Sequence, residues 1–240
     1  DTIECTGSYD LSSPPINCWV FPGRHGVEDI VTGIQNSCNV VFAELGHRLS
    51  LTEDGTYSSE KGLEAIRKYA SMFGLDHTSG IELPETEPHL TTEDPERSAM
   101  GQGTNSYSNV QLSRYISAVA NRGTVFELSL LDKLTDSDGN LIEDYTPETS
   151  SQIEAKTSTW DAVQSGIRRV VTEGSAKKCI RRLPCRSGRK DRYGTGGSEP
   201  VQPCIFRFLC SLFQSGDRGN GQYPIWLCGN QCGFSWKTDL

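Results

Sequence analysis

Two short segments of this 240-residue chain place a serine hydroxyl beside residues that can support chemistry. Ser37-Cys38-Asn39 sets a hydroxyl two positions before a carboxamide, and Ser58-x-x-Lys61 sets a hydroxyl one helical turn before an amine. A serine becomes a nucleophile or a proton carrier only when a base or an amine activates it. Short polar side chains also favour helix ends, where they compete for backbone hydrogen bonds. Taken alone, each spacing therefore fits an ordinary helix start, with the Ser37 hydroxyl free to face a cleft.

The cysteines form a second group of reactive side chains, and they are unevenly spread. Cys5, Cys18 and Cys38 stand in the first 178 residues, and the sequence alone leaves open whether they pair. The last 62 residues hold the other six, which are Cys179, Cys185, Cys204, Cys210, Cys228 and Cys232. Six cysteines in so short a segment can form three disulfides in several pairings. This tail has no pair of C-x-x-C knuckles, so a zinc site there is weakly supported. We predict no metal site and no cofactor.

Charge divides the chain at the same place. Residues 1–178 have a net charge of -13 and residues 179–240 a net charge of +5, which together give the total of -8. The acidic total argues against a general nucleic-acid binder. No apolar run approaches the ~18 residues of a membrane-spanning helix. The chain opens on Asp1 without a signal pattern, so we expect a processed product or a fragment.

Hydrophobic periodicity predicts the elements that position these groups. A helical pattern over 27–49 is interrupted at 36–39, which predicts a new helix over 40–49. Further helices are predicted over 59–73, 108–121 and from Thr159, as N-cap, to Gly174. Strands are predicted over 128–134 and at 141–142, with a turn at 136–140 between them. The acidic loop over 82–97 is expected to be a solvated surface. Helices and hairpins in mixed order, without βαβ units, indicate an α+β fold.

Five segments, in order, resemble the transpeptidase domain of class B penicillin-binding proteins. They are Asn17-Cys18-Trp19 followed by His25-Gly26, Ile34 to Asn39 with its Ser-x-Asn triplet, Gly101-Gln102-Gly103 with the helix after it, the turn 136–140, and the helix 163–174. The resemblance covers residues 1–178. It implies the penicillin-binding, serine β-lactamase-like fold, an antiparallel sheet flanked by helices, which is incomplete in this chain.

The resemblance also implies a chemistry, which is D,D-transpeptidation on the D-Ala-D-Ala stem peptides of peptidoglycan. In this family a serine nucleophile is acylated, and β-lactams compete for it. Ser37 and Asn39 would be catalytic, with Ser37 as the relay hydroxyl and Asn39 holding the donor peptide amide. Gln102 is a candidate substrate-binding residue. The expected partners are stem peptides and β-lactams, and no nucleic acid. The parent would work at the extracytoplasmic face of the bacterial membrane, tethered by an N-terminal anchor not present here.

Two of the three family motifs are missing. No Ser-x-x-Lys precedes Ser37, so the nucleophile is expected upstream of Asp1, and Ser58 is interpreted as a helix cap. The Lys-Thr-Gly triplet is also absent. One permitted codon set for residues 188–194, read one nucleotide later, gives Ala-Gly-Lys-Thr-Gly-Thr. We therefore interpret residues 1–178 as a partial transpeptidase domain and 179–240 as an out-of-frame tail, shifted by a single nucleotide near Lys178.

The missing motifs predict that the chain is inactive as it stands. Two alternative functions remain open. The parent could be a β-lactam sensor or a serine β-lactamase relative, which share the fold. The chain could also be a non-catalytic, cysteine-rich interaction protein. Labelling by a fluorescent penicillin separates an enzyme from a binding protein.

Overall fold

The computed structural model describes residues 1–146, 148–175 and 177, and the predicted out-of-frame tail lies outside this part of the chain. The strands are short and run in antiparallel pairs. They are β1 (Ile3–Cys5) with β4 (Gly26–Glu28), β2 (Ser8–Tyr9) with β3 (Ile16–Asn17), β5 (Thr124–Phe126) with β8 (Thr149–Gln152), and β6 (Lys133–Thr135) with β7 (Leu141–Asp144). The helices are α1 (Ile30–Gln35), α2 (Asn39–Leu49), α3 (Ser59–Met72), α4 (Pro95–Ala99), α5 (Asn109–Ala120) and α6 (Thr157–Thr172). The mixed helices and antiparallel ladders confirm the α+β class.

Local sequence explains where most of these helices begin. Ser58 accepts a hydrogen bond from the Lys61 amide and so caps α3, as predicted. Ser108 and Gln111 form a reciprocal capping box at the start of α5. The predicted cap at Thr159 is wrong, because α6 already begins at Thr157 and lacks a side-chain cap. Its start therefore depends on packing rather than on a polar cap.

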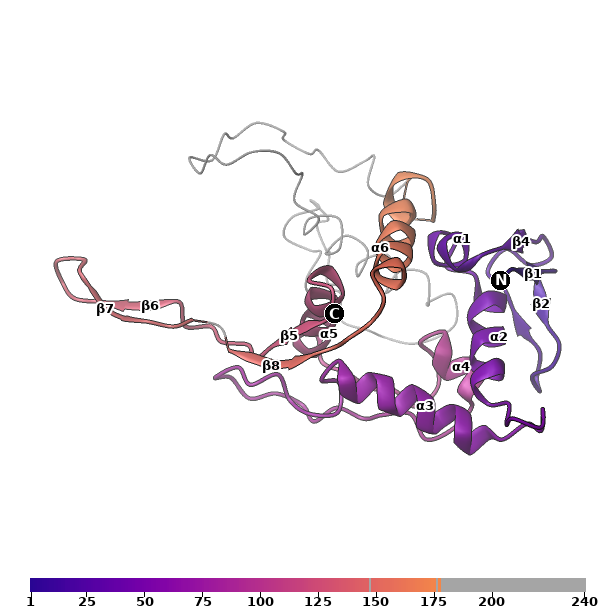
Figure 1. Ribbon diagram of the computed structural model, residues 1–240, viewed down its shortest axis with the longest axis horizontal. Helices are drawn as coiled ribbons and strands as arrows, with labels where there is room; N and C mark the ends of the chain where they lie inside the picture. Colours follow the sequence, from indigo (N-terminus) through magenta and orange to yellow (C-terminus); the bar gives the residue numbers. More distant parts are fainter. Residues whose placement is uncertain (147, 176, 178–240) are drawn as a thin grey trace, which may run out of the picture.

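Three apolar clusters hold the described elements together, and the third packs α5 and α6 against β5. The first joins the N-terminal strands to α2 and contains three cysteines; its buried members are Cys5, Tyr9, Ile16, Cys18, Cys38, Val40, Val41 and Ala43. The second packs α5 against α6, with Ile34 of α1 beside it. A Cβ on Gly166 would lie 2.9 Å from Cβ of Ile34, so α6 approaches α1 closely only because that side chain is absent. Figure 1 shows α1 and α6 side by side.

Several polar and charged side chains are buried. The polar face of α5 contributes Gln111 and Arg114 to the interior, and Arg114 is only 1% exposed. The acidic loop is solvated only in part, since Glu96 on α4 is 6% exposed. Its carboxylate bonds His47 of α2 at 3.3 Å and Tyr57 at 3.2 Å. These polar contacts attach α4 to α2, which a local pattern of charges does not predict.

The β6–β7 hairpin stands apart from the helices (Figure 1). Its turn was predicted correctly, because the Asp136 carboxylate accepts hydrogen bonds from the amides of Asp138 and Asn140. The first strand was predicted too early: of residues 128–134 only Lys133 and Leu134 belong to β6. Within the described residues, no helix is long and apolar enough to cross a membrane.

Candidate functional site

The junction between α1 and α2 carries the Ser-x-Asn triplet, and its backbone is unusual. Ser37 has a φ of 48°, in the left-handed region that favours glycine. Its amide donates to the carbonyl of Ile34 at 3.1 Å, and the Cys38 amide donates to Gly33 at 3.0 Å. This pair of bonds is the Schellman pattern that ends a helix. A serine therefore occupies the position where a glycine is usual, which costs about 1–2 kcal/mol.

Neighbouring side chains hold this junction in place. Trp19 donates its indole N–H to the carbonyl of Asn36 at 2.8 Å. Asn36 in turn donates to the carboxylate of Glu28, which is 3% exposed. Asn39 donates its Nδ2 to the carbonyl of Asn17 at 3.0 Å, so part of its hydrogen-bonding capacity ties α2 to β3. The triplet is thus supported from the lead-in segment that precedes it.

The end of α6 reaches the same junction from 138 residues away. The hydroxyl oxygens of Ser37 and Ser175 lie 3.3 Å apart. The Ser175 amide also donates to the carbonyl of Gln35. A Cβ on Gly174 would lie 2.1 Å from that same carbonyl oxygen, so the approach requires glycine. Either hydroxyl can donate in this hydrogen bond. The Ser37 hydroxyl, which belongs to the triplet, is half-buried.

Gln102 lies in a different turn, the one after α4. Gly101 and Gly103 have φ values of 81° and 84°, in the left-handed region that a tight turn requires and glycine adopts without strain. The side chain of Gln102 is exposed, and its backbone N–H donates to the carbonyl of Arg97 at 2.9 Å. Among the described residues, no hydrogen bond joins Gln102 to Ser37 or Asn39. Its role in substrate binding stays a prediction.

A cluster that the sequence analysis missed lies directly behind the triplet. The imidazole Nδ1 of His25 is 3.6 Å from Sγ of Cys5 and 3.5 Å from Sγ of Cys18. The Sγ atoms of Cys18 and Cys38 are 3.9 Å apart. The hydrogen bond with Cys38 holds the pKa of the Cys18 thiol below its ordinary value, while this bond and burial raise the pKa of Cys38. These four residues contain no C-x-x-C pair. Their residue types, three cysteines and one histidine, could have indicated the cluster, but their spacing could not.

Comparison with known proteins adds independent evidence for the family. Residues 1–188 match the penicillin binding protein transpeptidase domain. The chain belongs to this family. It is 29% identical over 175 residues to penicillin-binding protein 2A of Bacillus subtilis, a match that covers 66% of this chain and 24% of that protein. It is 25% identical over 188 residues to stage V sporulation protein D of the same organism, covering 75% of this chain and 27% of the relative. The chain thus spans about a quarter of these relatives.

Solved structures of penicillin-binding proteins share the fold. Penicillin-binding protein 2B of Streptococcus pneumoniae (strain 5204) superposes with a TM-score of 0.62 at 18% identity, over 76% of this chain and 33% of that one. A peptidoglycan synthase complex gives 0.63 at 19% identity, over 77% and 30%. Together with the family match over residues 1–188, this shared fold confirms a transpeptidase domain of the class B penicillin-binding type.

Ser58 offers no second nucleophile in this penicillin-binding domain. Its hydroxyl accepts from the Lys61 amide at 3.4 Å, and the Lys61 ammonium donates instead to the carbonyl of Leu51 at 2.5 Å. The amine therefore does not activate the hydroxyl. Ser58 caps the start of α3, as predicted.

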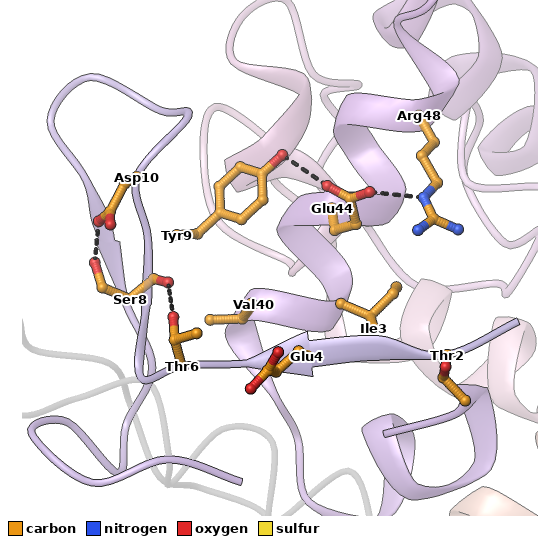
Figure 2. A pocket seen from close by; sticks show the side chains of 10 residues that line it. All are labelled: Thr2, Ile3, Glu4, Thr6, Ser8, Tyr9, Asp10, Val40, Glu44 and Arg48. Atoms are coloured by element: carbon orange, nitrogen blue, oxygen red, sulfur yellow. Dashed lines mark hydrogen bonds and ion pairs between the residues drawn. The ribbon is translucent and has the colours of Figure 1, made fainter. Parts of the chain in front are cut away.

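A hollow beside β1, β2 and α2 is a weaker candidate site (Figure 2). Its polar groups satisfy one another: Tyr9 donates to Glu44 at 3.1 Å, and Arg48 donates to the same carboxylate at 2.7 Å. Burial, followed by the bond to Glu44, raises the pKa of Tyr9. Groups paired in this way are not free to meet a ligand, so we assign no function to this hollow.

Proposed function

We propose that these residues belong to a D,D-transpeptidase that cross-links peptidoglycan, and that Ser37 and Asn39 are its Ser-x-Asn pair. The observation that carries the proposal is the conformation of Ser37. A left-handed serine at a helix end is less stable than glycine, and such strain persists mainly where a side chain is required. Here it presents the hydroxyl to the segment after α6, a helix that resembles the one leading up to the last catalytic strand in this family.

In the proposed mechanism, Ser37 carries a proton and Asn39 orients the substrate. Acylation of the nucleophilic serine expels a D-alanine amine, which must gain the proton that the nucleophile loses. A hydroxyl can accept one proton while it donates another, so Ser37 can pass this proton without a net change of charge. The Asn39 carboxamide, held through Nδ2 by Asn17, retains its oxygen as an acceptor for a peptide N–H of the donor stem.

We further propose that the nucleophile lies outside these 240 residues and that the chain alone forms no acyl-enzyme. The sequence has no Ser-x-x-Lys before Ser37, and the amine of Lys61 is directed away from Ser58. The test is incubation with a fluorescent penicillin followed by denaturing electrophoresis. We expect no labelled band. A covalent adduct mapped by mass spectrometry to any serine of this chain would overturn the proposal.

The roles of Ser37 and Asn39 are tested in the longer protein that carries these residues. Ser37→Ala is expected to slow acylation by a fluorescent penicillin about 10²- to 10⁴-fold, the usual contribution of a positioned proton carrier. Ser58→Ala is the matched control, since it removes a hydroxyl from a helix cap and should leave the rate unchanged. Equal rates for Ser37→Ala and the parent would exclude the relay.

We also propose that the transpeptidase sequence gives way to an out-of-frame tail near Lys178. The abrupt change in charge and cysteine content supports this boundary, and the family match ends close by, at residue 188. The coding DNA decides the question. If the reading frame shifted by one nucleotide does not give Lys-Thr-Gly, the tail is a genuine part of the protein. The parent is proposed to act at the extracytoplasmic face of the membrane, where its substrate is found.

A further inference from the structure

Four potential metal ligands converge inside the N-terminal part of the domain. Cys5 ends β1, Cys18 follows β3, His25 precedes β4, and Cys38 precedes α2. Their ligand atoms all lie within 4.8 Å of one another. The chain places them far apart in sequence, so only the folding of two strand pairs against α2 brings them together.

The distances match the edges of a tetrahedral zinc site. Zinc binds thiolate sulfur at about 2.3 Å and imidazole nitrogen at about 2.0–2.1 Å, so tetrahedral geometry separates two sulfurs by about 3.8 Å and a sulfur from a nitrogen by about 3.6 Å. The Cys18 and Cys38 sulfurs are 3.9 Å apart. The His25 Nδ1 lies 3.6 Å from Sγ of Cys5 and 3.5 Å from Sγ of Cys18.

Burial and composition also favour a metal over simple packing. Cys5, Cys18 and Cys38 are at most 2% exposed. An apolar core gains nothing from an imidazole directed at two thiols. The Nε2 atom of His25 is buried without a partner among the described residues, so the ring is not held by a hydrogen bond on that side. Coordination through Nδ1 would hold it.

We propose that Cys5, Cys18, Cys38 and Nδ1 of His25 bind one zinc ion. Three thiolates, a neutral imidazole and Zn²⁺ give a net charge of -1, and binding releases to solvent the protons that the thiols still carry. Four protein ligands fill the tetrahedron and leave no position for water. The site is therefore structural rather than catalytic.

The metal acts on the Ser-x-Asn triplet through its middle residue. Cys38 lies between Ser37 and Asn39, so zinc fixes the backbone of both to β1 and to the loop before β4. This second step rests on the proposed function of the triplet, whereas zinc binding does not. The ion would thereby make the junction between α1 and α2 more rigid, although Ser37 in that junction has a strained backbone.

The first experiment uses the full chain, reduced and purified without chelator. We expect about one tightly bound zinc per chain by elemental analysis. Alkylation followed by peptide mass spectrometry should show that zinc protects Cys5, Cys18 and Cys38. The six cysteines from Cys179 onward are the internal comparison, because they could bind metal independently. Zinc that leaves the first three thiols reactive, or a disulfide between Cys18 and Cys38 in the native protein, would overturn the proposal.

The second experiment compares His25→Gln with His77→Gln, a histidine outside the cluster. His25→Gln should weaken zinc binding at least about 100-fold in competition with a chelator, since one of four ligands is lost. His77→Gln should bind as the parent does. If His25→Gln does not fold, cobalt substitution of the parent still decides, because tetrahedral thiolate coordination gives intense visible absorption. Parent-like affinity in His25→Gln, or a cobalt spectrum without thiolate bands, would contradict the site.

The coupling to the triplet has its own readout. Hydrogen exchange of the amides at 36–39 should slow on zinc addition in the parent and in His77→Gln. Unchanged exchange in this segment, with zinc bound at the three cysteines, would remove the positioning role and retain the site. If the longer protein binds zinc at these cysteines but is not acylated by a β-lactam, the proposed function fails and the zinc site stands. If it is acylated but binds no zinc there, the zinc site fails and the proposed function stands.

Discussion

The ends of α3 and α1 have the same pattern of backbone hydrogen bonds but differ in the residue that adopts the left-handed conformation. At the end of α3, the amides of Gly74 and Leu75 donate to Ser71 and Ala70, and Gly74 has a φ of 71°. At the end of α1 the same pattern closes on Ser37, with a φ of 48°. The first end uses the residue that adopts this conformation without strain, whereas the second accepts strain and gains a hydroxyl.

What lies against each end explains the difference. Beneath Gly74 the buried guanidinium of Arg114 donates to the carbonyls of Gly74, His77 and Thr78. That end is therefore a structural anchor between α3 and α5. The end of α1 faces the hydroxyl of Ser175 and a cluster of thiols, so its surroundings are reactive groups. Stability is concentrated at one helix end and chemistry at the other.

The largest predicted effect removes the anchor. Arg114→Met removes a buried guanidinium and leaves three carbonyls, one of them on the buried Gly74, without their donor, and is expected to lower the free energy of unfolding by about 3–5 kcal/mol. Arg67→Met is the matched control, because Arg67 is more exposed and should cost less than about 1 kcal/mol. Urea titration of both variants measures the difference. Equal midpoints would mean that Arg114 is not an anchor.

The next largest effect is expected when the glycine at the end of α3 is replaced. Gly74→Ala imposes a left-handed alanine and sets its Cβ about 2.9 Å from the guanidinium of Arg114. We expect a loss of about 2 kcal/mol, since both strain and crowding act. Gly55→Ala also has a positive φ but open space around it, so it isolates the strain. A Gly74 variant no less stable than the Gly55 variant would show that crowding is absent.

At the end of α1 the reverse exchange, which introduces a glycine, should stabilise the fold. Ser37→Gly relieves the strain and is expected to raise the free energy of unfolding by about 1 kcal/mol, whereas Ser37→Ala keeps it and should not. Both variants lose the hydroxyl and should acylate equally slowly in the longer protein. A destabilised Ser37→Gly would refute the view that this serine is retained against stability.

The smallest predicted effect is an acid sensitivity that depends on Glu85. Burial opposes ionisation of Glu85, yet hydrogen bonds from Ser108 and Ser79 hold the pKa of its carboxyl below the ordinary value. A depressed pKa stabilises the fold above the unfolded pKa of about 4.3, and this stability is lost as pH falls through the folded value. Glu85→Gln should flatten the change in unfolding free energy below about pH 4. A slope identical to that of the parent would exclude this contribution.

Local pattern was sufficient for much of the fold. The break at 36–39, the cap at Ser58, the stop at Gly74 and the turn at Asp136 all follow from short-range backbone preferences, which the sequence states directly. The triplet itself was found in the same way. The predicted strand over 128–134 was wrong in most of its length because strands depend on partners, and β6 pairs only where β7 returns.

The sequence by itself determined the helix boundaries near strong caps, the α+β class and membership in the penicillin-binding transpeptidase family. Only the tertiary structure decided that Ser37 meets Ser175, that Arg114 and Glu96 are buried, and that Cys5, Cys18, His25 and Cys38 converge. The physical reason is range. Capping and periodicity act within a few residues, whereas a buried charge or a metal cluster depends on contacts between segments whose separation along the chain carries no pattern.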